Sequence, residues 1–308
     1  MPKHGCLAPI GSGKTCGEKA IRSHTVGLSR DLRSIADANG LVRGAKLKMS
    51  AIFDFGNGAF EDIPVKRASV FPGFCHEHDS GIFRPIDDDP WDGSEQHIFL
   101  LGYRALCREV YAKLTNVESF MPAAINNAGG AGREELIRWN EGEELGLRES
   151  LRDKASMDRK LRSGDFRCNS HVISLGADFP LRVAGVFVPE FDYEDRRLYD
   201  LSDYATPAHR ISVCTHTIEN DVLGIFVAFS QEPKLSQYLE SLKRVTKNEP
   251  RAYFAQACFD NFEHIYFSIS WWNQLRERHR IGIENRFEIS GPGRRPHGMS
   301  LDPIFQFV

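Results

Sequence analysis

Two pairs of metal-ligand residues, separated by almost sixty positions, constrain this chain more than any other feature of its sequence. Cys6 and Cys16 flank a glycine-rich segment, and Cys75 with His78 has Cys-x-x-His spacing. Structural zinc takes four thiolate or imidazole ligands in a tetrahedron, commonly as two pairs. Three residues are about one helical turn, so the second pair would face one way from the start of a helix. We therefore expect Cys6, Cys16, Cys75 and His78 to bind one structural Zn²⁺ ion.

The segment between the first two cysteines looks superficially like a phosphate-binding loop. Residues 8–15 read Ala-Pro-Ile-Gly-Ser-Gly-Lys-Thr. A phosphate loop needs a buried strand before it and a helix whose first amides point at the phosphates. Only seven residues precede this loop, and Cys16-Gly17 stands where the helix should begin. We interpret Gly11-Ser12-Gly13 instead as the turn that lets Cys6 and Cys16 converge.

A histidine lies between the two ligand pairs in a strand-like run. His24 sits in residues 21–26, which are rich in β-branched side chains, eight positions after Cys16. A cysteine-glycine knuckle followed by a Cys-x-x-His helix is a treble-clef arrangement, and the whole of residues 6–83 resembles the HNH, or ββα-metal, nucleases. The resemblance implies that His24 is the general base that activates water. It also implies that His78 or Asp79 holds a catalytic divalent metal, Mg²⁺ or Mn²⁺.

The chain departs from that family in two respects. About fifty residues separate His24 from Cys75, where compact members have far fewer, and residues 46–62 read as an inserted hairpin with its turn at Gly56-Asn57-Gly58. The asparagine that usually precedes the helix is absent from residues 69–74. The zinc ligands are therefore better supported by the sequence than the catalytic residues.

The remainder of the chain predicts helices followed by a sheet. Apolar residues recur every three or four positions over 95–118, which predicts an amphipathic helix. A second, highly charged helix is expected over 133–162. A glycine-rich loop joins the two helices into a hairpin, which could be a connecting arm or a dimer surface. From about residue 166 the period changes to two, which predicts antiparallel strands, and helices follow from about residue 235. We expect an α+β fold with a zinc unit at 1–92, a helical connector at 93–164 and an α+β domain at 165–308.

The distribution of charge and the absence of long apolar runs indicate which partners and which cellular location to expect. The 308 residues have a net charge of −3, yet residues 1–50 carry nine Lys or Arg against three acids, and residues 51–100 carry ten acids against three bases. A basic segment bearing His24 suits a phosphate backbone, so we expect DNA or RNA as a partner; a solvated surface is the alternative reading. No apolar run reaches the roughly 18 residues of a membrane helix, and the expected location is the cytoplasm.

Other candidate sites are weaker. Cys168 and His171 form a rival zinc half-site, and the acidic group Glu190, Asp192, Glu194 and Asp195 could hold a metal or be a solvated strand end. Cys107, Cys214 and Cys258 lie in apolar patterns and read as core thiols. The sequence is compatible with two functions. The first is a metal-dependent HNH-like endonuclease with a regulatory C-terminal domain, of the kind found in bacterial defence. The second is a non-catalytic module, held together by zinc, that binds nucleic acid or protein. Self-association is compatible with either.

Overall fold

The chain folds into two units, and neither of them is continuous in sequence. The computed structural model describes residues 5–11, 13–46, 59–289 and 299–306. The first unit comprises residues 1–23, 71–168 and 202–209, and the second comprises residues 24–70, 169–201 and 210–308. Together they are the mixed α+β fold expected from the sequence, with a large antiparallel sheet and helices.

The first unit is a small hairpin followed by helices. Its elements are β1 (Pro9–Gly11), β2 (Lys14–Thr15), α2 (His76–Asp87), α3 (Glu95–Thr115), a π-helical turn (Asn116–Phe120), α4 (Met121–Asn127) and α5 (Gly130–Ser163). The periodicity over 95–118 is confirmed as α3, which begins where the hydroxyl of Ser94 accepts a hydrogen bond from the amide of His97. The charged helix is confirmed as α5, which ends at Gly164 in the left-handed conformation.

Helix α3 is the centre of the first unit. Its residues 97–107 are all buried, and it packs against α2 and α5. A buried polar network links it to α5: the hydroxyl of Tyr103 donates to Asp158 at 2.7 Å, and Lys154, which is itself buried, bonds to both carboxylate oxygens of Asp158. The buried ammonium is therefore paired with a carboxylate, as a charge in a protein interior requires.

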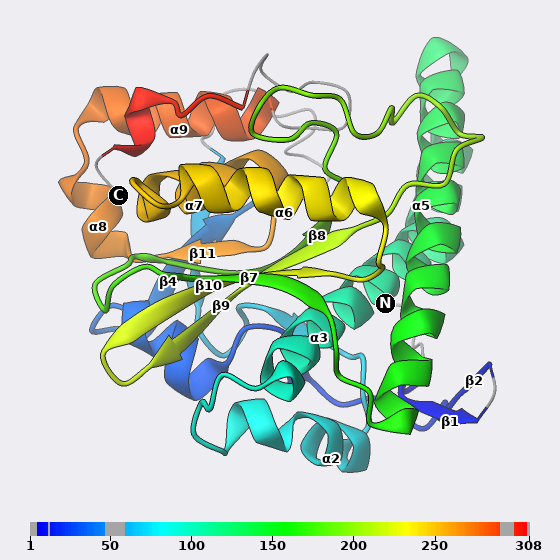
Figure 1. The fold of residues 1–308 in the computed structure, drawn as a ribbon. Helices are drawn as coiled ribbons and strands as arrows, with labels where there is room; N and C mark the ends of the chain where they lie inside the picture. The colour runs from blue at the N-terminus through cyan, green and yellow to red at the C-terminus, as the bar shows by residue number, and fades with distance from the viewer. Residues whose placement is uncertain (1–4, 12, 47–58, 290–298, 307–308) are drawn as a thin grey trace. The chain divides into compact units, whose positions relative to one another are not determined.

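The second unit is built on a seven-stranded antiparallel sheet. The strand order is β5 (Phe60–Pro64), β4 (Leu41–Ala45), β11 (Ile265–Phe267), β8 (Leu181–Phe187), β9 (Ile211–Ile218), β10 (Asp221–Ala228) and β7 (Asn169–Ser174). Figure 1 shows α6 (Pro233–Val245) and α7 (Pro250–Asn261) lying across one face of this sheet. The other helical segments are η1 (Leu28–Leu32), η2 (Arg33–Ile35), α8 (Ile269–Gln274), α9 (Glu277–Ile289) and η4 (Pro303–Phe305).

Aromatic side chains fill the layer between the sheet and its helices. Phe60 of β5 makes edge contacts with Phe259 of α7, Phe267 of β11 and Trp272 of α8. Ring pairs in this geometry are favourable beyond the area they bury. Phe60 is thus part of the core of the second unit.

That contact lies within the second unit, to which residues 24–70 belong. Strand β4 pairs with β5 on one side and with β11 on the other, so β5 is the edge of the large sheet; the predicted hairpin at 46–62 overlaps β5 and not β4. The predicted turn at Gly56-Asn57-Gly58 lies outside the described residues. Local sequence predicted a hairpin in this region with bounds that miss β4, and it gave no information about the strand beside which the hairpin would pair.

A second, very short ladder joins the segments that flank this insertion. Strand β3 (Ser23–His24) pairs with β6 (Val70–Phe71). Next to it, the amide of Ile21 donates to the carbonyl of Phe74 at 2.7 Å, and the amide of Thr25 donates to the carbonyl of Ser69 at 3.0 Å. The ends of the 45-residue stretch between them are therefore closed by backbone hydrogen bonds.

Candidate metal centre

The first ligand pair is positioned by the β1–β2 hairpin. The amide of Cys16 donates to the carbonyl of Ala8 at 2.8 Å, and the amide of Gly17 donates to the carbonyl of Cys6 at 3.0 Å. Gly17 has a φ of +71°, which favours glycine at this position. These bonds hold both cysteines at the base of one hairpin, as expected; Ser12 of the predicted turn lies outside the described residues.

The second pair is positioned by the first turn of α2. Cys75 is the N-cap residue, in extended conformation, and its carbonyl accepts from the amide of Asp79 at 2.8 Å. The hairpin is joined to the residues just before this helix by the amide of Leu7, which donates to the carbonyl of Gly73 at 2.8 Å. Backbone hydrogen bonds thus tie the hairpin to the start of α2.

The four side chains meet around a common centre. One ligand atom from each of Cys6, Cys16, Cys75 and His78 lies within 4.8 Å of all the others. The Nδ1 atom of His78 is 3.2 Å from the Sγ of Cys75 and 3.6 Å from the Sγ of Cys6. With Zn–S and Zn–N bonds of about 2.3 and 2.0 Å, a tetrahedron has S···N edges of about 3.5 Å. The donor set and its dimensions therefore fit a zinc ion.

The four side chains of the site are only partly accessible to solvent. Cys6 and Cys75 are buried, whereas Cys16 and His78 are partly exposed. Burial, with the neighbouring Cys75 thiol, raises the pKa of Cys6 to about 11, although backbone hydrogen bonds oppose the rise. A buried thiol is neutral by itself, and a bound divalent cation would reverse that preference by favouring thiolates.

The two residues predicted to be catalytic fall in different units. His24 is the second residue of β3, is half-buried and belongs to the second unit. Asp79 lies in the first turn of α2, is half-buried and belongs to the first unit, next to the ligand His78. The described residues bring the four predicted ligands together, and the catalytic roles of His24 and Asp79 stay predictions.

The rival half-site does not extend to a metal-binding group. Among the residues that the structure describes, neither Cys168 nor His171 belongs to a cluster of three or more metal-ligand side chains. The Nε2 atom of His171 lies 3.1 Å from the hydroxyl of Thr246, and burial lowers the pKa of its ring. Cys107, Cys214 and Cys258 are buried, as expected of core thiols.

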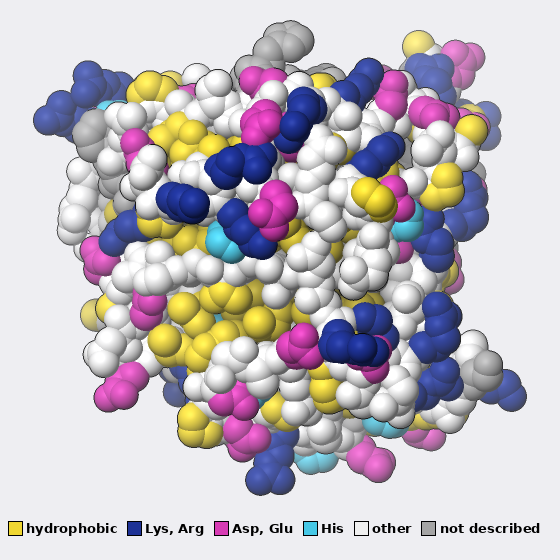
Figure 2. Space-filling view, in the orientation of Figure 1, with side chains coloured by type: hydrophobic (Ala, Val, Ile, Leu, Met, Phe, Trp, Pro, Cys, Tyr) yellow, Lys and Arg dark blue, Asp and Glu magenta, His cyan; other side chains and the backbone are white. Residues whose placement is uncertain are grey.

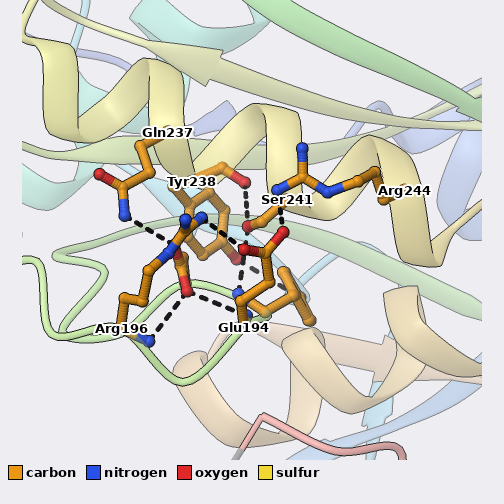
Figure 3. Close-up of polar contacts among 8 residues, drawn as sticks. Glu194, Arg196, Gln237, Tyr238, Ser241 and Arg244 are labelled. Carbon is orange, nitrogen blue, oxygen red and sulfur yellow. Dashed lines mark hydrogen bonds and ion pairs between the residues drawn. The ribbon is translucent and has the colours of Figure 1, made fainter.

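The acidic group at residues 190–195 is a hydrogen-bonded turn. Asp192 has a fully buried side chain, contrary to the solvated strand end considered from the sequence. Its carboxylate accepts hydrogen bonds from the amides of Glu194 and Arg196, from the guanidinium of Arg196 and from the side-chain amide of Gln237. Figure 3 shows two of these donors, Arg196 and Gln237, and also Glu194, which forms an ion pair with Arg244 of α6. The donors already occupy the lone pairs that a metal would need.

Sequence reasoning did not identify Gly5, which shapes this site, or a hydrogen bond made by Tyr266 within the second unit. A Cβ atom on Gly5 would lie only 2.1 Å from the carbonyl oxygen of Gly17, so the two strands of the knuckle can approach only because residue 5 is glycine. The signal was present, since a glycine directly precedes Cys6 and another directly follows Cys16. The hydroxyl of Tyr266, which accepts from the buried amide of Ser69 at 2.7 Å, had no comparable signal because the two residues are far apart in sequence.

The centre is interpreted from its own chemistry, because comparison with known proteins found no match. No protein-family model, curated protein or solved structure matches the chain. Within the described residues, no helix has the length and apolar character needed to cross a membrane.

Proposed function

We propose that Cys6, Cys16, Cys75 and His78 bind a structural Zn²⁺ ion that fastens the β1–β2 hairpin to the start of α2. The observation that carries the proposal is the mutual approach of all four ligand atoms within 4.8 Å. Four protein ligands complete a tetrahedron, whereas a catalytic zinc keeps one position for water or substrate. The order of knuckle, β3–β6 pair and ligand-bearing helix supports a treble-clef unit.

We propose further that this zinc unit is a non-catalytic module that binds nucleic acid. Lys14, Lys19 and Arg22 are exposed in or just after the hairpin, and Ile10 of β1 is 58% exposed. Cationic side chains gain free energy from counterion release when they contact a phosphate backbone, and an exposed aliphatic side chain gains from contact with a base. The binding surface would then be the hairpin, with the ion holding it in place.

An HNH-like endonuclease is the second candidate, favoured by the order of elements. His24 ends a short strand, its partner strand β6 follows, and α2 carries Asp79 directly after the zinc ligand His78. In this alternative His24 takes a proton from the attacking water and Asp79 binds Mg²⁺ or Mn²⁺, which would stabilise the charge that develops on the phosphate. Because Nδ1 of His78 faces the cysteine sulfurs, the second metal would rely on Asp79 and not on His78.

The structural role is tested first by metal content. Elemental analysis of the purified chain should find one zinc per chain, and Cys75→Ser and His78→Ala should each lower that content and the thermal stability. Cys168→Ser is the matched control, since this half-buried thiol lies outside the cluster. A wild-type chain without zinc, or a Cys75→Ser variant that keeps its full content, would rule out the site.

The two functions are separated by binding and cleavage assays on the same preparations. The module predicts salt-dependent binding of labelled DNA or RNA that is weakened by Lys14→Glu and Lys19→Glu, without cleavage in Mg²⁺ or Mn²⁺. The nuclease predicts cleavage of plasmid or RNA that His24→Ala abolishes while zinc content stays at one. Absence of both binding and cleavage would refute both functions and leave the zinc site itself untouched.

A further inference from the structure

Helix α5 carries a straight row of exposed positions along its outer side. Residues 134, 137, 141, 144, 148, 151 and 155 are spaced alternately by three and four, which places them on one face. All of them are exposed except Glu144, which is partly so, and Ile137 and Leu151 are among the large apolar side chains most open to solvent, at 37% and 42%. We call this row the α5 seam.

The seam lies opposite the face by which α5 packs in its own unit. Ser150, Asp153 and Met157 are buried against the first unit, and each lies two positions after a seam residue. Two positions correspond to about 200° around a helix. The intramolecular contacts of α5 therefore leave the seam free for another surface.

Charge is distributed unevenly along α5. Its first seventeen residues, 130–146, carry two Arg and five Glu, a net charge of −3, and its last seventeen, 147–163, carry six Lys or Arg and three acids, a net charge of +3. Figure 2 shows Lys and Arg side chains gathered at the right-hand edge of the view, over the lower, C-terminal half of α5. The helix dipole acts only within the first and last turns, so it does not account for Glu141, Glu144, Arg148 and Arg152 near the middle.

We propose that α5 is a self-association surface on which a second copy of this chain binds with its own α5 antiparallel. Antiparallel pairing about the midpoint places the acidic half of each helix against the basic half of the other. In that register Glu144 of one copy faces Arg148 of the other, twice about the symmetry axis, and Ile137 of one copy reaches Leu151 and Ala155 of the other. Such a contact is isologous and closes as a dimer.

The charges on the seam also disfavour a parallel pair of helices. Parallel helices would set Glu144 against Glu144 and Arg148 against Arg148, with like halves in contact along the whole length, which is unfavourable. Glu144 already accepts a hydrogen bond from the side-chain amide of Asn140 of its own helix at 2.8 Å, so its carboxylate is held in place before association. Because the seam has few apolar side chains, the dimer should depend strongly on ionic strength.

Sedimentation velocity of the full chain over a range of concentrations tests the proposal. A reversible dimer should form at low salt and dissociate as salt rises toward about 500 mM, where the Debye length falls to roughly 4 Å. Glu144→Arg and Arg148→Glu should each weaken the dimer by about tenfold or more, and the double exchange of both residues should restore it to within about threefold. Glu135→Arg makes the same charge change at an exposed position off the seam and should have little effect.

Several outcomes would overturn the proposal. These are a monomer at every concentration, an equal effect of Glu135→Arg and Glu144→Arg, or a double exchange that fails to restore association. A dimer that neither single reversal weakens would also overturn it, because in a parallel pair each reversal only exchanges one like-charge contact for another. Helical circular dichroism on each variant establishes that α5 is intact, and zinc content on the same samples keeps this test independent of the metal centre.

Discussion

The Sγ atom of Cys6 lies 3.6 Å from the Nδ1 atom of His78, although 72 positions separate the two residues in sequence. That proximity connects the start of the chain to the first turn of α2. A ligand that binds only the folded arrangement stabilises it by mass action, so removal of the ion should loosen what the four side chains hold together.

Metal removal should therefore act locally. After chelation, hydrogen exchange should accelerate in β1, β2 and the first turn of α2, and it should stay unchanged in β9 and β10, which are held by a long ladder of their own. The measurement is mass spectrometry of amide exchange with and without chelator, followed by addition of zinc. Equal acceleration in both regions would contradict a local structural role, as would protection that does not return with zinc.

Gly5→Ala should disrupt the knuckle. The added methyl would lie 2.1 Å from the carbonyl oxygen of Gly17, so the strands that bear Cys6 and Cys16 must separate. We expect zinc affinity, measured by competition with a chromophoric chelator, to fall by about tenfold or more, which corresponds to at least about 1.4 kcal/mol. Gly11→Ala is the control, because a methyl there meets nothing within 4 Å; similar losses in the two variants would show that the close approach at Gly5 is unimportant.

Tyr266→Phe should destabilise the second unit. The phenol oxygen accepts from the amide of Ser69, which is buried and has a φ of +56°, and the substitution leaves that amide without its acceptor. An unsatisfied buried donor costs about 1–3 kcal/mol, and urea denaturation should show a loss of this size. Tyr204→Phe, at a residue that is 58% exposed, should leave the free energy of unfolding nearly unchanged. An unaltered midpoint for Tyr266→Phe would mean that the hydrogen bond does not contribute.

Asp192 should make stability depend on pH in the acid range. Burial acts to raise the pKa of its carboxyl, but hydrogen bonds from Gln237, Arg196 and the amide of Glu194 outweigh it, and the pKa falls below the usual 3.8. A depressed folded-state pKa contributes stability that is fully present above 3.8 and is lost as pH falls through the folded-state value. Asp192→Asn should thus lower the free energy of unfolding by about 1–3 kcal/mol near neutral pH and by progressively less below pH 3.8.

The measurement is urea denaturation at a series of pH values for both proteins. Asp178→Asn is the control, since its carboxylate is 81% exposed and its ion pair with Arg251 should contribute little. A difference between wild type and Asp192→Asn that stays constant from neutral to acid pH would contradict the assigned role of the carboxylate.

Several features were determined by the sequence alone. Ligand type and spacing identified Cys6, Cys16, Cys75 and His78, because thiols and imidazole at turn spacings have few other uses in one cluster. Hydrophobic period identified α3 and the strands from β7 to β10, because each period reports which face of a local element is buried. Each of these patterns is formed by residues that lie within one turn, one helix or one strand of each other in the sequence.

Only the tertiary structure decided which segments share a unit. The sequence predicted a hairpin over residues 46–62, whereas the strands that pair are residues 41–45 and 60–64, and the place of β4 beside β11 depends on backbone hydrogen bonds to a strand more than 200 residues away. The same reason separates His24 from the zinc unit and buries Asp192 beneath donors from a later helix. A local pattern specifies which face of a strand or turn is apolar, whereas its partner is chosen by the packing of the whole chain.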